Sequence, residues 1–239
     1  NEVLILSFIV FFFLCCTSCL TNQQNTGITD TPADSTSLKY ARGFDIYIYD
    51  HYKKLTVRNP WQNSRNNAFY YFLTSESRLA DTMKSPDFII TPVKKVICLS
   101  TTHIAFLDLL NETNCIYGIS GCKYINNQKV RTQIAQGKII ETGYEQNLNY
   151  ELIVQLQPDI VFAYGVTAKH LSWVKKLEEL GIRVVYIAEY LERTPLAKAE
   201  WLKFFAPFFH KDSLAASTFD DIDSSYHALK TDRKSTRLN

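Results

Sequence analysis

The sequence predicts an α/β fold: a parallel sheet with helices on both faces, preceded by an antiparallel β-meander and followed by a long helix. Three observations support this. Five short β-branched runs recur between residues 95 and 189, the segments between them mostly resemble helices, and each run ends in a small or polar cluster. Such alternation indicates right-handed crossovers and a parallel sheet. The five runs are Lys95–Leu99, Cys115–Ile119, Lys138–Thr142, Asp159–Tyr164 and Arg183–Ala188.

The composition is that of a folded chain without a bias toward nucleic acid. Of the 239 residues, 46% are hydrophobic and 21% are charged, and 26 Lys plus Arg against 24 Asp plus Glu give a net charge of +2. A charge this small provides no basic footprint, so no nucleic-acid partner is expected. The 14 Tyr, 15 Phe and 3 Trp suit either a core or a surface for a large, flat ligand.

The first 19 residues are interpreted as a signal peptide that ends in a lipidation site. Val3–Leu14 is apolar except for Ser7, and it is shorter than the roughly 20 residues that a membrane-spanning helix needs. The following Cys16-Thr17-Ser18-Cys19 resembles a lipobox with Cys19 as the lipidated residue; the alternative is a plain signal peptide with incidental cysteines. Residues 20–37 are polar and without a hydrophobic period, which predicts a flexible tether.

Residues 38–91 are predicted to form the antiparallel meander. Apolar and polar residues alternate in Phe44–Tyr49 and Leu55–Arg58, and Ala68–Leu73 makes a third run after a polar loop. We expect these strands to extend the parallel sheet.

Residues 92–209 are predicted to form one α/β lobe with a ligand pocket at one edge of its sheet. Ligands of open α/β sheets bind outside the carboxyl ends of the strands, so the polar clusters that end the five runs should line one rim. The predicted helices are Thr101–Leu110, Leu148–Gln157, Thr167–Leu180 and Pro195–Phe209, the last interrupted by Pro207.

Residues 210–230 are predicted to begin the long helix, because apolar residues recur there at helical spacing. Residues 231–239 are polar and basic, and no structure is predicted for them. They are either a frayed tail or foreign sequence joined to a broken reading frame. We favour the second interpretation, because the resemblance described next implies a further lobe after this helix.

Five segments, in this order, resemble one known family. They are Lys95–Ser100, Ile116–Ser120, Gly143–Leu148, Glu151–Val161 and Leu177–Val185. Together they resemble the helical-backbone (type III) periplasmic substrate-binding proteins of ABC importers, which take up ferric siderophores, haem and cobalamin. The resemblance covers residues 95–230. It implies two chelatase-like α/β lobes joined by one long helix, of which this chain holds the first lobe and the start of the helix.

The resemblance also implies a role. It indicates a monomeric lipoprotein, anchored by lipid to a bacterial membrane in the periplasm, with no cofactor of its own. The implied ligand is an iron chelate (a ferric siderophore or haem) or cobalamin, and the implied partners are an ABC permease and its ATPase. Glu151 stands where the family carries a glutamate that docks on permease arginines; a carboxylate favoured by the helix dipole is the alternative. The residues placed on the ligand cleft are His103, Tyr124, Tyr144, Glu189, Tyr190 and Arg193.

Three of these side chains also have a simpler interpretation. His103 either contacts a metal chelate or hydrogen-bonds its own loop. Tyr144 either stacks on a chelate or macrocycle or packs on a neighbour within its turn. Arg193 either pairs with ligand carboxylates or forms a surface ion pair with Glu189 or Glu192.

No catalytic equipment is visible. The sequence contains no GxGxxG, Walker A, GxSxG or HExxH motif, and its five histidines lie far apart without metal-site spacing. We therefore predict neither enzymatic activity nor a resident metal. A Cys115–Cys122 disulfide is an alternative to free thiols. Two other functions stay open: a one-lobed surface lipoprotein that binds another protein, and a chelatase-like metal-handling enzyme.

Overall fold

The computed structural model describes residues 31–78, 88–144, 147–165 and 171–236. The chain divides into two units, residues 1–31 and 32–239, and every element below belongs to the second. The predicted signal peptide, with Cys19, lies outside the described residues, as does most of the predicted tether. Within the described ranges, none of the helices combines the length and apolar character needed to cross a bilayer.

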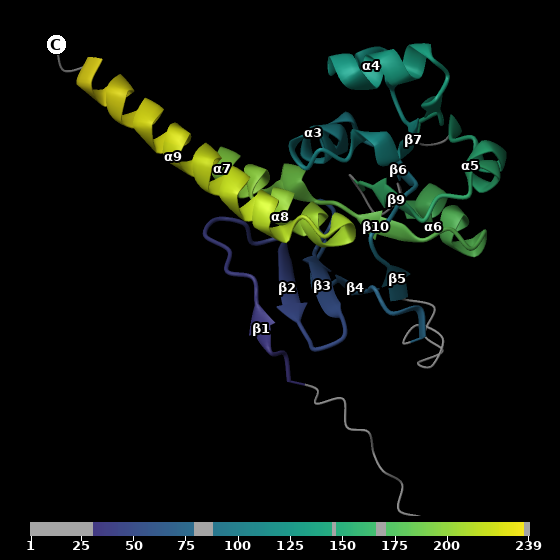
Figure 1. The fold of residues 1–239 in the computed structure, drawn as a ribbon, viewed down its shortest axis with the longest axis horizontal. Helices are drawn as coiled ribbons and strands as arrows, with labels where there is room; N and C mark the ends of the chain where they lie inside the picture. The colour runs from purple at the N-terminus through teal and green to yellow at the C-terminus, as the bar shows by residue number, and fades with distance from the viewer. Residues whose placement is uncertain (1–30, 79–87, 145–146, 166–170, 237–239) are drawn as a thin grey trace, which may run out of the picture. The chain divides into compact units, whose positions relative to one another are not determined.

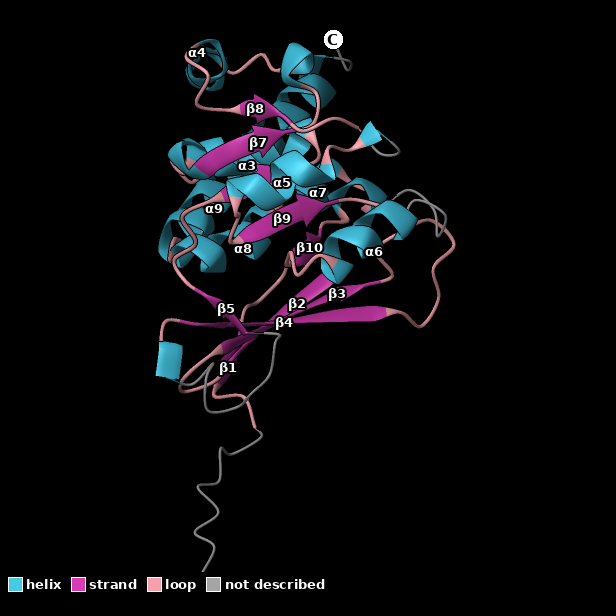
Figure 2. Cartoon of the chain, turned by 90° about the vertical axis from the view of Figure 1, so that its right-hand side faces the viewer, coloured by secondary structure: helices cyan, strands magenta, loops and turns pink. Residues whose placement is uncertain are grey.

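Five parallel strands form the sheet that carries the candidate site (Figures 1 and 2). Their spatial order is β10-β9-β6-β7-β8, and all pairings between them are parallel. Every residue of β6 and β9 is buried, which is typical of a sheet covered on both faces. Each strand lies within a run that the sequence singled out, so the predicted α/β fold is confirmed. The strands are β6 (Val96–Cys98), β7 (Ile116–Ile119), β8 (Ile140–Glu141), β9 (Ile160–Ala163) and β10 (Val184–Tyr186).

Helices cover both faces of this sheet. They are α3 (Thr101–Leu109), α4 (Gln128–Ala135), α5 (Tyr150–Leu156) and α6 (Leu171–Glu179), of which α4 was not predicted. Successive residues of a strand point to opposite faces. Accordingly, Cys98 of β6 packs in one apolar cluster with Leu107 of α3, whereas Ile97 packs in another with Ile153 of α5 and Trp173 of α6.

The N-terminal meander forms a second sheet rather than an extension of the first. Its strands follow in chain order and are antiparallel except between β4 and β5. They are β1 (Asp34–Ser35), β2 (Phe44–Ile48), β3 (Lys53–Arg58), β4 (Ala68–Thr74) and β5 (Phe88–Ile90). The expectation that the meander extends the parallel sheet is therefore wrong, and β1 lies within the stretch assigned to the tether.

The physical reason lies at β10, the edge strand of the parallel sheet. There the Tyr186 amide donates a hydrogen bond to the Tyr71 hydroxyl of β4 at 2.8 Å. A side chain thus satisfies a buried edge N–H that a further strand would otherwise pair. The meander covers this edge instead of continuing it.

Phenylalanine-rich helical segments fill the space between the two sheets. The segment predicted as one helix over Pro195–Phe209 consists of α7 (Pro195–Ala199), α8 (Leu202–Phe205) and the 3-10 helix η6 (Ala206–Phe209). The ring centroid of Phe204 lies 5.4 Å from that of Phe44 in β2, and that of Phe205 lies 4.8 Å from that of Phe162 in β9. One core therefore joins both sheets.

The last element, α9 (Asp212–Thr236), projects from the remainder of this unit (Figure 1). Its residues 231–236 are helical, where a structureless tail was expected; no Gly or Pro follows Pro207 to end the helix earlier. Ala215 and Phe219 are buried near its start, whereas Leu229 is 70% exposed.

Two carboxylates hold five consecutive backbone amides where the chain approaches β2. Glu200, which is fully buried, accepts hydrogen bonds from the amides of residues 39, 40 and 41 at 2.8, 2.7 and 2.8 Å. Glu192 accepts those of residues 42 and 43 at 2.8 Å each. We refer to these two glutamates and residues 39–43 as the carboxylate clamp.

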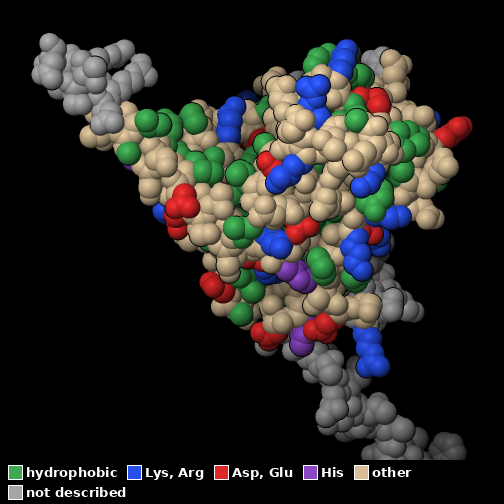
Figure 3. All heavy atoms as spheres, turned by 45° about the horizontal axis from the view of Figure 1, so that its top comes forward, with side chains coloured by type: hydrophobic (Ala, Val, Ile, Leu, Met, Phe, Trp, Pro, Cys, Tyr) green, Lys and Arg blue, Asp and Glu red, His purple; other side chains and the backbone are tan. Residues whose placement is uncertain are grey.

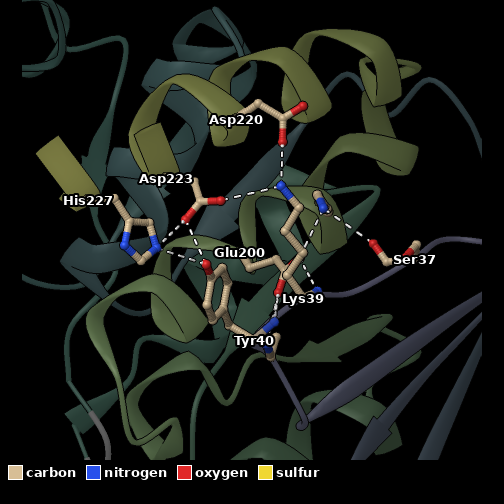
Figure 4. A network of polar contacts seen from close by, with 9 residues as sticks. Ser37, Lys39, Tyr40, Glu200, Asp220, Asp223 and His227 are labelled. Atoms are coloured by element: carbon tan, nitrogen blue, oxygen red, sulfur yellow. Dashed lines mark hydrogen bonds and ion pairs between the residues drawn. The ribbon is translucent and has the colours of Figure 1, made fainter. Parts of the chain in front are cut away.

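Side chains of the clamp also reach neighbouring helices (Figure 4). The Lys203 ammonium of α8 lies 2.9 Å from Glu200. Lys39 contacts Asp220 and Asp223 of α9 at 3.2 and 3.3 Å, and the Tyr40 hydroxyl donates to Asp223 at 2.8 Å. The start of the N-terminal sheet is thus fastened to the C-terminal helices.

Candidate ligand-binding site

The carboxyl ends of the five parallel strands meet at one edge of the sheet, as predicted. We refer to the described segments that follow them as the rim. The chain passes from the central strand β6 to β7 on one side, whereas β9 lies on its other side. Between β6 and β9 the strand order therefore reverses, and ligands of open α/β sheets bind at such a point. The rim consists of residues 100–102, 121–124, 141–144, 164–165 and 189–190.

The helix start after β6 is tied to the segment after β10. Ser100 caps α3 by accepting a hydrogen bond from the Thr102 amide, which leaves Thr101 and Thr102 exposed at the first turn. The Thr102 hydroxyl donates to Glu189 at 2.6 Å. This contact spans β9 and brings the two sides of the reversal point together.

Glu189 is a buried carboxylate with an unused oxygen. Glu189 is only 6% exposed, and its Oε2 atom has no hydrogen-bond partner within the described part of the chain. Burial raises the pKa of this carboxyl, which the Thr102 hydrogen bond partly opposes. Glu189 is therefore suited to receive a donor, or a proton, at the rim.

Glu141 organises the opposite half of the rim, although it was not among the predicted site residues. This residue ends β8, and its carboxylate accepts hydrogen bonds from the amides of Gly121 and Cys122 at 2.9 and 2.7 Å and of Gly143 at 3.1 Å. Charge-assisted bonds of this kind fix two loops relative to each other. A carboxylate at a strand end, one residue before a Thr-Gly turn, was the available signal.

Tyr124 and Tyr144 come together on those two loops. A Cβ atom placed on Gly121 would lie 3.2 Å from Tyr124 Cδ2 and 3.5 Å from Tyr144 Cε1, so both rings flank this glycine. Tyr124 is 61% exposed and Tyr144 40% exposed. Exposed aromatic rings with polar tips are suited to contact a flat or partly apolar ligand.

His103 does not face the rim. It is fully buried between Phe162 and Phe205, whose ring centroids lie 6.1 and 5.9 Å away. Burial lowers its pKa to about 3, and neither ring nitrogen has a partner within the described residues. The expectation of a ligand contact is corrected here: His103 lies on the core side of α3, on the same face as Leu107 four residues later.

The remaining predicted residues are spread more widely. The Tyr190 hydroxyl donates to the Gly165 carbonyl, which joins the segments after β10 and β9, and burial raises the pKa of Tyr190 to about 12. Arg193 is exposed and lines a neighbouring cleft. Glu151 is exposed in the first turn of α5, whose Asn149 cap accepts from the Leu152 amide.

Charged side chains and thiols are distributed over the described part of the chain. Basic and acidic side chains are interspersed over the described residues on the face drawn in Figure 3. In the ranges that the structure describes, no group of three or more His, Cys, Asp or Glu side chains is placed to hold a metal ion. Cys98, Cys115 and Cys122 are free thiols, so the alternative disulfide is not formed in this structure.

Comparisons with known proteins show the family. A family model described as periplasmic binding protein matches residues 96–236. An uncharacterized lipoprotein of Methanocaldococcus jannaschii is 28% identical over 233 residues, covering 85% of this chain and 54% of the relative. A second uncharacterized lipoprotein of that organism is 28% identical over 175 residues, covering 72% and 43%. The chain thus spans about half the length of these relatives.

Among solved structures, a periplasmic binding protein from Veillonella parvula aligns with a TM-score of 0.49 at 14% sequence identity, covering 71% of this chain and 51% of that one. A periplasmic haem-binding protein from Pseudomonas aeruginosa aligns with a TM-score of 0.44 at 17% identity, covering 55% and 44%. The family match spans all five strands of the parallel sheet and the whole of α9. The chain therefore belongs to the periplasmic binding protein family, a family of solute-binding proteins rather than enzymes.

Proposed function

We propose that the intact protein is the extracytoplasmic receptor of an ABC importer, which captures an iron chelate (a ferric siderophore or haem) or cobalamin and delivers it to a membrane permease. The observation that carries the proposal is the rim, where five strand ends bring two exposed tyrosines and a buried carboxylate to one edge of the sheet. Family membership supports a binding role. The lipoprotein names of the relatives support an extracytoplasmic location. We place the lipid anchor at Cys19, because residues 16–19 resemble a lipobox.

The ligand class follows from the rim's chemistry together with the resemblance. Large chelates and macrocycles offer flat apolar faces, on which Tyr124 and Tyr144 would pack. The Glu189 carboxyl, with one free oxygen, would supply a specific polar contact. A site with apolar rings and few polar groups is usual for small-molecule ligands.

Glu151 is proposed as the contact to the permease. It is exposed at the first turn of α5, and α5 begins at the same sheet edge as the rim. A receptor that docks through this edge would present its ligand directly to the transporter. The dipole of α5 favours the carboxylate at this position in either case.

A binding titration tests the proposal. The intact protein is titrated with haem, cyanocobalamin and a ferric hydroxamate siderophore, and binding is followed by absorbance and tyrosine fluorescence. We expect one of the three to bind with a dissociation constant of about 1 µM and to be recovered chemically unchanged. Replacing both Tyr124 and Tyr144 by Ala should weaken this binding about tenfold or more, since each ring contributes on the order of 1 kcal/mol.

Tyr117→Ala is the matched control. Tyr117 is an exposed tyrosine of β7, and its ring lies 5.4 Å from Lys95 Nζ, at the amino end of β6 and opposite the rim. Its loss should leave affinity within about twofold of the parent. Absence of binding by all three ligands at about 100 µM would reject the proposal and favour a protein-binding lipoprotein.

A further inference from the structure

A cleft away from the rim tyrosines lies between the N-terminal sheet and the segment after β10. We propose that this cleft is a second binding site, for a small organic anion that carries two or more carboxylate or phosphate groups. Its volume is about 770 Å³, within the range of roughly 300–1,000 Å³ that small-molecule sites occupy. Polar side chains from both sides line it: Tyr40, Arg42, Asn59, Asn63, Arg193 and Thr194.

Two of the three arginines in this cleft have no acidic partner among the described residues. Three arginines line it against one glutamate, Glu192. Arg58 is held by Asp45 through two contacts of 2.7 and 2.8 Å. No hydrogen bond or ion pair to the guanidinium of Arg42 or Arg193 is found within the described ranges. The cleft therefore offers two planar cationic forks that match carboxylate or phosphate groups.

The glutamate in the cleft is already engaged by the backbone. Oε1 of Glu192 accepts hydrogen bonds from the amides of Arg42 and Gly43 and, at 3.1 Å, from the Trp201 indole. These bonds place the Arg42 main chain beside the segment that carries Arg193. The contact is tight, because a Cβ on Gly43 would lie 2.8 Å from Trp201 Cζ2 and 3.2 Å from Glu192 Oε1. Both sides of the cleft are thus fixed before any ligand arrives.

Neutral groups complete the site. Asn59 and Asn63 adopt left-handed backbone conformations in the loop after β3, with φ of 47° and 61°. The Asn59 amide donates to the Asn67 carbonyl at 2.8 Å, which closes this loop. The amide and hydroxyl side chains facing the cleft add donors that a polyanion can use.

This inference goes beyond the proposed function. Two of the arginines, Arg42 and Arg58, precede residues 96–236, the part that matches the family. A receptor for a chelate at the rim does not require this cleft. The cleft would instead bind an accompanying anion or a separate small molecule.

Isothermal titration calorimetry of the full chain tests the site, with tricarballylate as the polycarboxylate probe and pyrophosphate as the phosphate probe. We expect at least one to bind with a dissociation constant below ~1 mM in about 50 mM salt. Arg42→Ala and Arg193→Ala should each weaken it about tenfold or more. Arg193→Lys should recover only part of this loss, because an ammonium lacks the planar fork. Whichever probe binds identifies the anion class.

Two controls separate this site from others. Arg131→Ala removes an exposed arginine on α4, outside the cleft, and should leave affinity within about twofold of the parent. The Tyr124 and Tyr144 double variant should bind the anion normally, so the failure of one site is distinguishable from the failure of the other. The proposal is overturned if neither anion binds at about 10 mM, or if the Arg42 and Arg193 double variant binds as well as the parent.

Discussion

Glu200 provides the sharpest stability test, because one fully buried carboxylate accepts three backbone hydrogen bonds and contacts one ammonium. Glu200→Ala would leave the Lys203 ammonium without its carboxylate and three amides without an acceptor. Hydrogen bonds to charged groups contribute about 1.5–3 kcal/mol each, but Lys39 is exposed and its amide can reach water. Breaking a buried pair costs about 3–5 kcal/mol, and we expect a loss of this size in the free energy of unfolding.

Urea unfolding of the full chain measures this loss, with Glu179→Ala as the control. Glu179 is exposed at the end of α6, and its removal should change stability by less than about 0.5 kcal/mol. Hydrogen exchange at the amides of residues 39–41 would show whether the clamp opens locally. A Glu200→Ala variant within about 1 kcal/mol of the parent, with unchanged exchange there, would refute the reasoning.

The pH dependence of the same group has a definite sign. Burial alone would raise the pKa of Glu200, but the amides of Ala41, Lys39 and Tyr40, together with the Lys203 ammonium, lower it further than burial raises it. A carboxyl whose pKa is lower in the fold stabilises the fold above its unfolded pKa and loses that effect as the pH falls through the folded value. The advantage of the parent over Glu200→Gln should therefore shrink below about pH 4.

Three further predictions concern other sites. Gly43→Ala should lower the free energy of unfolding by about 1–3 kcal/mol, measured by urea, because the added methyl meets the buried Trp201 ring. The stability of Glu189→Gln relative to the parent should increase as the pH rises from 4 to 8. Burial raises the pKa of the Glu189 carboxyl, so its ionised form opposes folding at the higher pH. A difference in stability between the two proteins that does not change with pH would contradict this. Glu141→Gln should cost about 1–3 kcal/mol and speed amide exchange at Gly121, and unchanged exchange there would show that other contacts hold the loop.

Local pattern predicted most of the parallel sheet. Strand β9 is continuously apolar, with two β-branched residues and one aromatic residue among its four, and it is bounded by Pro158-Asp159 and Gly165. Its position and burial could therefore be predicted without tertiary information. The start of helix α3 could likewise be predicted from local sequence, because hydroxyl side chains at its first residues are typical helix caps. The burial of the His103 side chain could also be predicted, because His103 precedes Leu107 by about one helical turn and so shares its face of the helix. Its position just after a strand end favoured a role in ligand binding instead.

Long-range features were not accessible in this way. The Tyr71 hydroxyl that covers the edge of β10 lies 115 residues from its partner, and the clamp joins residues 149 to 161 apart. Neither the alternation of apolar and polar residues nor the residue types at turns carry information on such pairs. Each long-range contact depends on which surfaces meet after the strands and helices form. The proximity of Tyr124 and Tyr144 was easier to predict, because the loops that carry them follow neighbouring parallel strands and so lie at one edge of the sheet.

The carboxylate clamp has a mechanical consequence. A membrane tether attached before β1 would load the pairing of β1 with β2 first and then residues 39–43. There the load would be shared among five hydrogen bonds from backbone amides to two carboxylates. Bonds loaded in parallel resist a force together, whereas bonds opened one after another yield at a lower force. The load would pass into α7, which lies between the two glutamates in the chain, and into α9 through Lys39. The loops that carry Tyr124 and Tyr144 lie off this path, so tension on the anchor would leave the shape of these two loops unchanged.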